Sequence, residues 1–154
     1  MYAEVRALRP GAEVDDDVFL ALEHASGMRS QLWASVLAAQ PAPRLRVLGS
    51  RAAYVKWGLD VQEDALRAGA RPGDPGFGEE PPEAWGVLGS EEDAQPVQTE
   101  PGRYVEFYER MEQAIRAAGS PAAEPPVPLA AGVATLRVIE AARASAAERV
   151  VVPL

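Results

Sequence analysis

The fold class is indicated most clearly by residues 18–35, VFLALEHASGMRSQLWAS. Two runs of β-favouring residues, 18–24 and 28–35, flank a short loop that contains Gly27. Such runs, joined by a turn with glycine, are typical of an antiparallel hairpin. Both faces of the predicted strands mix apolar and polar side chains, so we expect helices to cover one face of the sheet and something else to cover the other.

A second hairpin is predicted further along the chain. Its strands would span residues 44–48 and 52–57, joined by a Gly-Ser turn. Two shorter edge strands are expected at 84–88 and 94–99. Together these segments predict an antiparallel meander.

Helices are predicted mainly in the second half of the chain. A short helix is expected over residues 60–69, with Asp60 as its N-cap. Apolar side chains spaced three and four residues apart predict an amphipathic helix over 102–118, and an alanine-rich run predicts another over 129–148. The valine-rich residues 149–154 predict a final strand. Antiparallel strands with a few helices place the chain in the α+β class.

Composition excludes several classes of function. The 154 residues correspond to one domain, and the absence of cysteine excludes disulfide scaffolds, thiolate metal sites and cysteine nucleophiles. With 15 Lys and Arg against 23 Asp and Glu, the net charge of -8 argues against nucleic acid or an anionic membrane as a partner. No apolar stretch approaches the roughly 20 residues of a membrane helix, and no signal peptide is visible. We therefore expect a soluble cytoplasmic domain.

Groups suited to catalysis or metal binding are scarce. His24, the single histidine, lies at the end of a predicted strand, where a turn histidine is more common than a catalytic base. The aspartates 15–17 point to alternating sides of an extended chain and cannot all face one cation. The glycines of 73–78 lack a preceding strand and a following helix, so they are no dinucleotide-binding motif. We predict no catalytic, cofactor or metal site in the chain itself.

One region gathers polar side chains where a strand meets a loop, residues 49–64. The predicted strand ends at Lys56 and continues through a glycine turn to Asp60 and Gln62. This arrangement suits a hydroxyl-rich ligand. The alternative is an ordinary strand-to-helix junction, in which Asp60 only caps the helix. The Pro- and Gly-rich residues 71–82 predict a surface loop, which is either functional or a plain excursion.

Three segments, 16–27, 46–56 and 58–69, resemble the C-terminal domain of the Gfo/Idh/MocA oxidoreductases, the family of glucose-fructose oxidoreductase and inositol dehydrogenase. The resemblance is strongest to the branch of scyllo-inositol-type dehydrogenases. That branch carries a Lys-x-Gly-x-Asp-x-Gln-Glu string, which stands here at residues 56–63. The similarity extends over nearly the whole chain.

The resemblance implies an open, largely antiparallel sheet with helices packed on one face. Residues 1–154 would form a single C-terminal substrate-binding and oligomerisation domain, and the N-terminal Rossmann domain that binds NAD or NADP in the family is absent from this sequence. The family's catalytic Glu-Lys-Pro and Asp-x-x-x-His motifs are absent as well. Lys56 lies in Val-Lys-Trp and His24 follows Leu-Glu, so neither inherits a catalytic role.

By resemblance, the parent protein is expected to be an NAD(P)-dependent oxidoreductase acting on an inositol-like sugar or polyol. This chain would contribute the substrate cleft and a homodimer interface through the uncovered sheet face, and alone it would be inactive. The side chains expected to bind the polyol are Lys56, Asp60 and Gln62, with Arg29 and Trp33 as further hydrogen-bonding or stacking groups. The alternative is a stand-alone, non-enzymatic dimerisation or ligand-binding module on the same fold.

Overall fold

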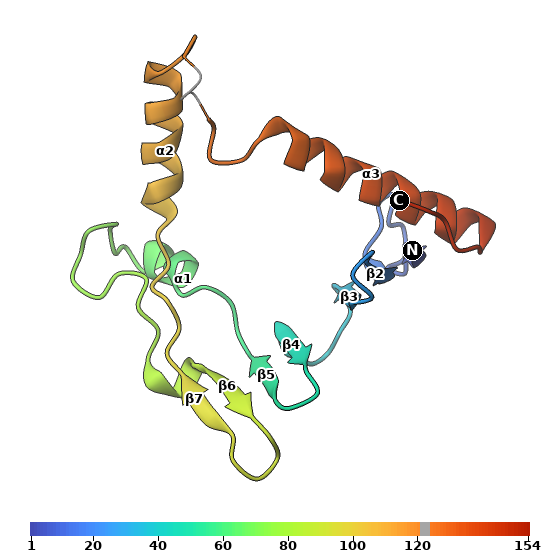
Figure 1. Ribbon diagram of the computed structural model, residues 1–154, viewed down its shortest axis with the longest axis horizontal. Helices are drawn as coiled ribbons and strands as arrows, with labels where there is room; N and C mark the ends of the chain where they lie inside the picture. The colour runs from blue at the N-terminus through green and yellow to red at the C-terminus, as the bar shows by residue number, and fades with distance from the viewer. Residues whose placement is uncertain (121–123) are drawn as a thin grey trace. The chain divides into compact units, whose positions relative to one another are not determined.

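A computed structural model of the chain describes residues 1–120 and 124–154 (Figure 1). It divides into two compact units. The first comprises Met1–Gln40 and Val127–Leu154, and the second comprises Pro41–Pro126. The strands form two antiparallel sheets, of three and four strands, with a few helices, which confirms the predicted α+β class. The Pro-Ala-Pro connection at 41–43 stands between the two sheets in the sequence, where prolines cannot donate to a ladder.

The first unit is a three-stranded sheet in the order β1-β2-β3, together with one long helix. Its elements are β1 (Tyr2–Arg6), β2 (Asp17–Glu23), β3 (Arg29–Ser35) and α3 (Leu129–Glu148). The predicted hairpin is confirmed as β2 and β3, with Phe19 opposite Trp33. The prediction of residues 149–154 as a strand is wrong. Only Val152 forms a strand-like pair of hydrogen bonds, 2.9 and 2.7 Å, with Met1.

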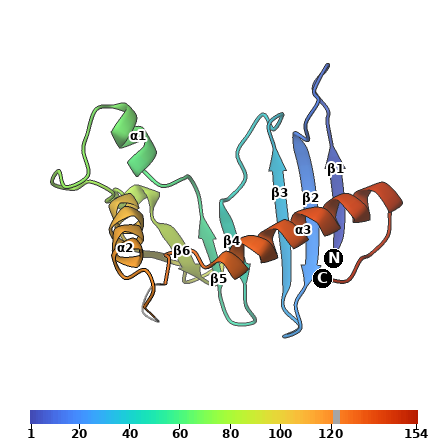
Figure 2. The ribbon, with the colours of Figure 1, turned by 90° about the horizontal axis from the view of Figure 1, so that it is seen from above.

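Strand β1 escaped sequence-based prediction because it is short and carries two charged side chains, Glu4 and Arg6. Its place in the sheet is set by pairing with β2 and by α3, which packs against it (Figure 2). Ala3 and Ala142 are the buried hydrophobic residues among those that the structure describes. Because both are small, the helix and the strand can approach closely.

Ser145 joins three parts of the first unit. Its side chain is fully buried, accepts a hydrogen bond from the backbone N–H of Ala3 at 2.9 Å, and donates one to the carbonyl of Val150 at 2.6 Å. The hydroxyl therefore satisfies a strand donor and a carbonyl beyond the helix end. Since side chains alternate along a strand, α3 covers the face of Ala3, and the opposite face, which carries Phe19 and Trp33, has no cover within this unit.

The second unit is a four-stranded antiparallel sheet in the order β4-β5-β6-β7. The predicted meander is confirmed, with bounds shifted by one or two residues. The strands are β4 (Leu45–Leu48), β5 (Ala53–Lys56), β6 (Gly86–Gly89) and β7 (Gln95–Val97). The helices are α1 (Gln62–Arg67), the 3-10 helix η1 (Pro82–Ala84) and α2 (Tyr104–Arg116). Within the described part of the chain, no helix is long and apolar enough to cross a membrane.

Replacing Ser145 with alanine tests its role in the first unit. Ser145→Ala removes one acceptor and one donor from a buried position, so we expect the free energy of unfolding to fall by about 1–3 kcal/mol in urea denaturation. Thr135→Ala on the same helix is the control, because that exposed hydroxyl bonds only the carbonyl of Ala131. The control should change stability by less than about 0.5 kcal/mol. Equal effects of the two variants would contradict this account.

Candidate functional site

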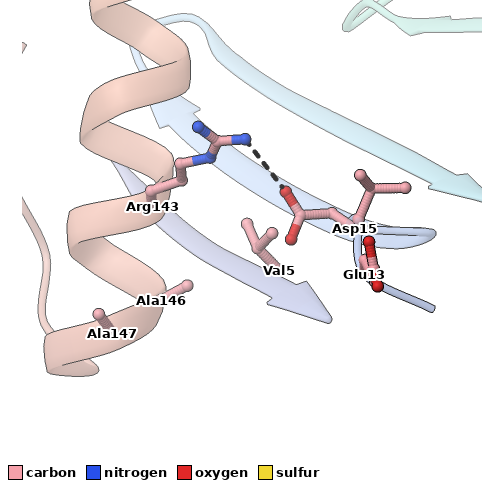
Figure 3. Close-up of a pocket in the computed structure, with 7 residues that line it drawn as sticks. Val5, Glu13, Asp15, Arg143, Ala146 and Ala147 are labelled. Atoms are coloured by element: carbon pink, nitrogen blue, oxygen red, sulfur yellow. Dashed lines mark hydrogen bonds and ion pairs between the residues drawn. The ribbon is translucent and has the colours of Figure 1, made fainter. Parts of the chain in front are cut away.

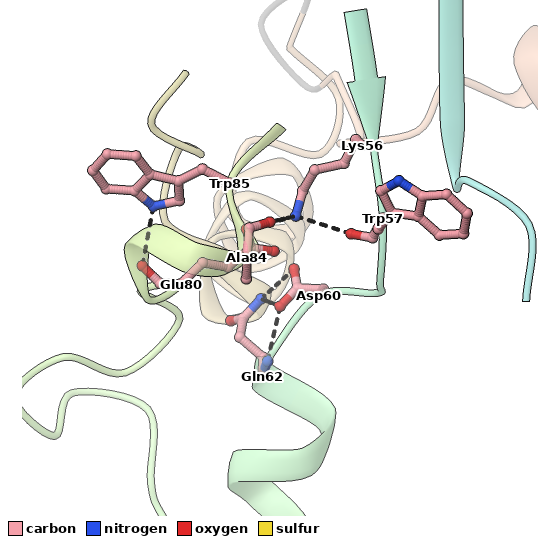
Figure 4. Close-up of polar contacts among 7 residues, drawn as sticks. All are labelled: Lys56, Trp57, Asp60, Gln62, Glu80, Ala84 and Trp85. Carbon is pink, nitrogen blue, oxygen red and sulfur yellow. Dashed lines mark hydrogen bonds and ion pairs between the residues drawn. The ribbon is translucent and has the colours of Figure 1, made fainter. Parts of the chain in front are cut away.

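The string at residues 56–63 lies where β5 ends and α1 begins, in the second unit (Figure 4). Lys56 is the last residue of β5 and Gln62 the first of α1. Between them, Gly58 adopts a φ of 77°. This left-handed backbone conformation is energetically costly for a residue that has a side chain. An open cavity of about 630 Å³ lies here; its lining includes Arg44, Lys56, Asp60, Glu63, Arg67, Glu80, Thr99, Glu100 and Tyr104.

Lys56 forms a buried ion pair with Glu80. Its ammonium donates to Glu80 Oε2 at 2.7 Å, to the carbonyl of Ala84 at 2.6 Å and to that of Trp57 at 3.2 Å. The side chains of Lys56 and Glu80 are only 10% and 6% exposed. An ammonium has three protons, so every donor of Lys56 is used. The ion pair thereby fastens the loop before β6 to the end of β5.

The environment of Glu80 keeps its carboxyl group ionised. Burial raises the pKa of Glu80, but the hydrogen bond and charge of Lys56, together with the hydroxyl of Thr99, outweigh burial, and the net pKa lies below the ordinary value. Thr99 Oγ1 is itself buried, with no partner of full hydrogen-bond geometry among the residues described. At neutral pH the site therefore holds a matched positive and negative charge.

Asp60 and Gln62 form a second polar group beside the ion pair. The Asp60 carboxylate accepts from the backbone N–H of Gln62 at 2.9 Å and from its side-chain amide at 3.0 and 3.1 Å. The amide oxygen of Gln62 accepts from the backbone N–H of Tyr104 at 2.9 Å. Tyr104 is the first residue of α2, so its backbone N–H has no hydrogen-bond partner inside the helix. Gln62 therefore caps α2 across 42 residues of sequence, and Asp60 orients its amide.

This second polar group requires a glycine at position 102. A Cβ atom built on Gly102 would overlap the side-chain nitrogen of Gln62 and the carboxylate of Asp60. The backbone N–H of Gly102 also donates to the carbonyl of Gly78 at 2.9 Å. The chain before α2 is thus held against both α1 and the Pro- and Gly-rich loop.

The structure brings together three of the five side chains expected to bind a ligand. Lys56 and Asp60 line the cavity, and Gln62 stands behind it, with no exposed surface. Asp60 is the exposed member of the three. It is not the N-cap of α1, which is Val61.

Arg29 and Trp33 lie elsewhere, on β3 of the first unit. Both are exposed, and Trp33 is 78% exposed. Their parity places them on the sheet face opposite α3. They belong to a different unit from Lys56, Asp60 and Gln62.

Three residues of the site were missed by sequence reasoning: Glu80, Thr99 and Gly102. Glu80 lies in the loop 71–82, which the sequence left as either functional or a plain excursion. Its side chain is buried, but a segment rich in proline and glycine has no periodic pattern from which burial could be predicted. Thr99 and Gly102 lie between β7 and α2, at the end of the strand predicted over 94–99 and at the start of the helix predicted over 102–118. Their roles arise from contacts with residues distant in sequence.

The glycines of 73–78 do not form a dinucleotide-binding turn. The pyrophosphate of a dinucleotide needs a glycine turn that opens a helix. Here the glycines of 73–78 lead through η1 into strand β6. No group of three or more His, Asp or Glu side chains in residues 1–120 and 124–154 could hold a metal ion.

The first unit has an open cavity of its own, of about 540 Å³, between α3 and the segment that precedes β2 (Figure 3). Arg143 reaches Asp15 across it at 3.5 Å. The rest of the lining is Val5, Glu13, Val14, Ala146 and Ala147. Both partners of this ion pair are well exposed, so it contributes little to stability.

Comparison with known proteins identifies the family. Residues 1–154 match the family model described as "Oxidoreductase family, C-terminal alpha/beta domain", that of the Gfo/Idh/MocA oxidoreductases. The chain belongs to this family. The resemblance seen in the sequence is therefore confirmed.

Several relatives share this domain. The chain is 32% identical over 96% of its length to the scyllo-inositol 2-dehydrogenase (NADP(+)) IolW of Bacillus subtilis, covering 41% of that protein. It is 34% identical over 97% of its length to the uncharacterized oxidoreductase YdgJ of Escherichia coli, covering 42% of it. The solved structure of the oxidoreductase YvaA of Bacillus subtilis matches with a TM-score of 0.87 and 31% identity, over 99% of this chain and 44% of that one. The chain thus spans less than half the length of these relatives.

Substitution of Gly102 tests the packing of the site. Gly102→Ala would force a methyl group into Asp60 and Gln62, so we expect the free energy of unfolding to fall by about 1–3 kcal/mol. Gly132→Ala in α3 is the matched control, since its Cβ would meet nothing within 4 Å. Alanine there should stabilise by about 0.5–1 kcal/mol. Chemical denaturation measures both, and a neutral Gly102→Ala variant would contradict the close approach.

Proposed function

We propose that this chain is the substrate-binding and oligomerisation domain of a longer NAD(P)-dependent oxidoreductase that acts on a hydroxyl group of an inositol-like sugar or polyol. The observation that carries the proposal is family membership over the whole chain, together with 32% identity to a scyllo-inositol 2-dehydrogenase. Hydride transfer belongs to the nicotinamide cofactor, which a separate domain would bind. We also propose a cytoplasmic location. The sequence has no cysteine, so it forms no disulfide that would require an oxidising compartment.

The cavity of the second unit supports a polyhydroxy ligand. Asp60 is exposed, and its two carboxylate oxygens retain capacity to accept from a ligand hydroxyl beyond the bonds with Gln62. Tyr104 is a further residue of the lining that carries a hydroxyl group. A volume of about 630 Å³ is ample for a six-carbon polyol.

The other members of the string act mainly on the shape of the cavity. Lys56 donates its three ammonium protons to Glu80, Ala84 and Trp57. Gln62 is fully buried. We assign to them the fixing of the cavity wall and to Asp60 the direct contact. Arg29 and Trp33 remain proposed as further ligand or interface groups from the first unit.

We also propose a homodimer through the uncovered sheet face of the first unit. Strand pairing places Phe19 and Trp33 side by side on the face that α3 leaves open. An exposed tryptophan in such a place is typical of an association surface. A second copy that presents the same patch would cover it by two-fold symmetry.

Turnover of scyllo-inositol by the full-length protein with NADP+ tests the proposed activity. Asp60→Asn removes the carboxylate charge offered to the substrate, so KM should rise about tenfold or more, the cost of a hydrogen bond to a charged group. Asp64→Asn is the control, because this neighbouring side chain is 90% exposed and does not line the cavity. Polyol binding without any NAD(P)-dependent turnover would instead favour the stand-alone binding module. A KM that is equal in both variants would contradict the role of Asp60.

The dimer is tested by light scattering of the full-length protein at fixed concentration. Trp33→Glu puts a charge at the centre of the proposed interface and should weaken dimerisation about 30-fold or more. Tyr108→Glu on α2 is the control, since this aromatic side chain is similarly exposed, at 70%, in the other unit. Dimerisation that survives Trp33→Glu would exclude this face.

A further inference from the structure

We propose that Glu80 determines the charge class of ligand that the cavity of the second unit accepts. By binding Lys56, it makes the cavity a site for neutral polyhydroxy compounds and excludes anions such as sugar phosphates and sugar acids. The inference rests on the proposed function only in taking this cavity as the ligand site.

The positive charges of the cavity wall are largely neutralised. Three cations line it: Arg44, Lys56 and Arg67. Lys56 is paired with Glu80 at 2.7 Å, and Arg67 is paired with Glu63 at 2.9 Å. Within the described residues, Arg44 is the cation of this lining that has no ion pair.

The carboxylates of the lining outnumber the cations. They are Asp60, Glu63, Glu80 and Glu100. Among the described residues, Asp60 accepts hydrogen bonds from the uncharged groups of Gln62 and forms no ion pair, so its negative charge is uncompensated at the cavity wall. An anionic ligand would meet this charge without gaining a free ammonium in return, and Arg44 is the single unpaired cation of the described lining that could oppose the repulsion.

Glu80 is the residue on which this balance depends. Two of the three protons of Lys56 are held by the backbone carbonyls of Trp57 and Ala84, which carry no net charge. The third is held by Glu80 alone. Without the carboxylate charge, the buried ammonium at the cavity wall would have no opposite charge beside it. Binding of an anion would then stabilise it. Phosphate or carboxylate oxygens would bind it by a charge-assisted hydrogen bond.

The test is titration of inorganic phosphate into the full-length protein by calorimetry. Glu80→Gln keeps the size of the side chain and an oxygen that can accept from Lys56, but removes the charge. We expect phosphate to bind this variant at least about tenfold more tightly than the wild type. Glu79→Gln is the matched control, because it changes the net charge equally at an exposed neighbour that does not line the cavity. It should bind phosphate like the wild type.

A double variant keeps the test decisive if Glu80→Gln does not fold. Combining Lys56→Gln with Glu80→Gln leaves no buried charge, and replacement of both partners is tolerated far better than loss of one. Phosphate affinity of the double variant should lie within twofold of the wild type. The proposal is overturned if wild-type phosphate binding is strong and is lost in the double variant. It is also overturned if a folded Glu80→Gln gains no more than Glu79→Gln. These readouts need neither polyol nor NADP+, so they are independent of the activity test.

Discussion

The buried ion pair between Lys56 and Glu80 holds the second unit together at the place where its sheet meets its loops. Two charges removed from water are tolerated only when nearly every hydrogen bond is satisfied. The carbonyls of Trp57 and Ala84 complete the shell of the ammonium. The pair joins the end of β5 to the loop before β6. Because both residues line the cavity, their contact fixes the position of this part of its wall.

The first unit relies on close approach more than on charge. Small side chains let α3 rest on β1, and one hydroxyl, that of Ser145, satisfies backbone groups on both sides of the contact. Within this unit, α3 covers only one face of the sheet. On the other face, Trp33 is exposed opposite Phe19, and this is the surface through which we propose that the homodimer forms.

The polar side chains of residues 56–63 have partners that are distant in the sequence. The position of this string at a strand-to-helix junction followed from local patterns, and the structure places a cavity there. Two of its polar side chains turned out to be buried, with partners from the loop before β6 and from the start of α2. Burial of Lys56 and Gln62 was not predictable, because polar residues at such a junction are usually solvated.

The sequence alone determined the antiparallel hairpins and the long helices, since alternation, helical spacing and turn residues are local properties. Its resemblance to the Gfo/Idh/MocA oxidoreductases, carried by segments such as residues 56–63, also indicated the family. Strand β1 was not predicted from the sequence, because a five-residue strand with two charged side chains shows too little apolar alternation. The tertiary structure decided that Lys56 meets Glu80 across 24 residues and that Gln62 caps α2 across 42. A buried polar group takes whichever partner the folded chain brings within reach, and no local periodicity encodes that choice.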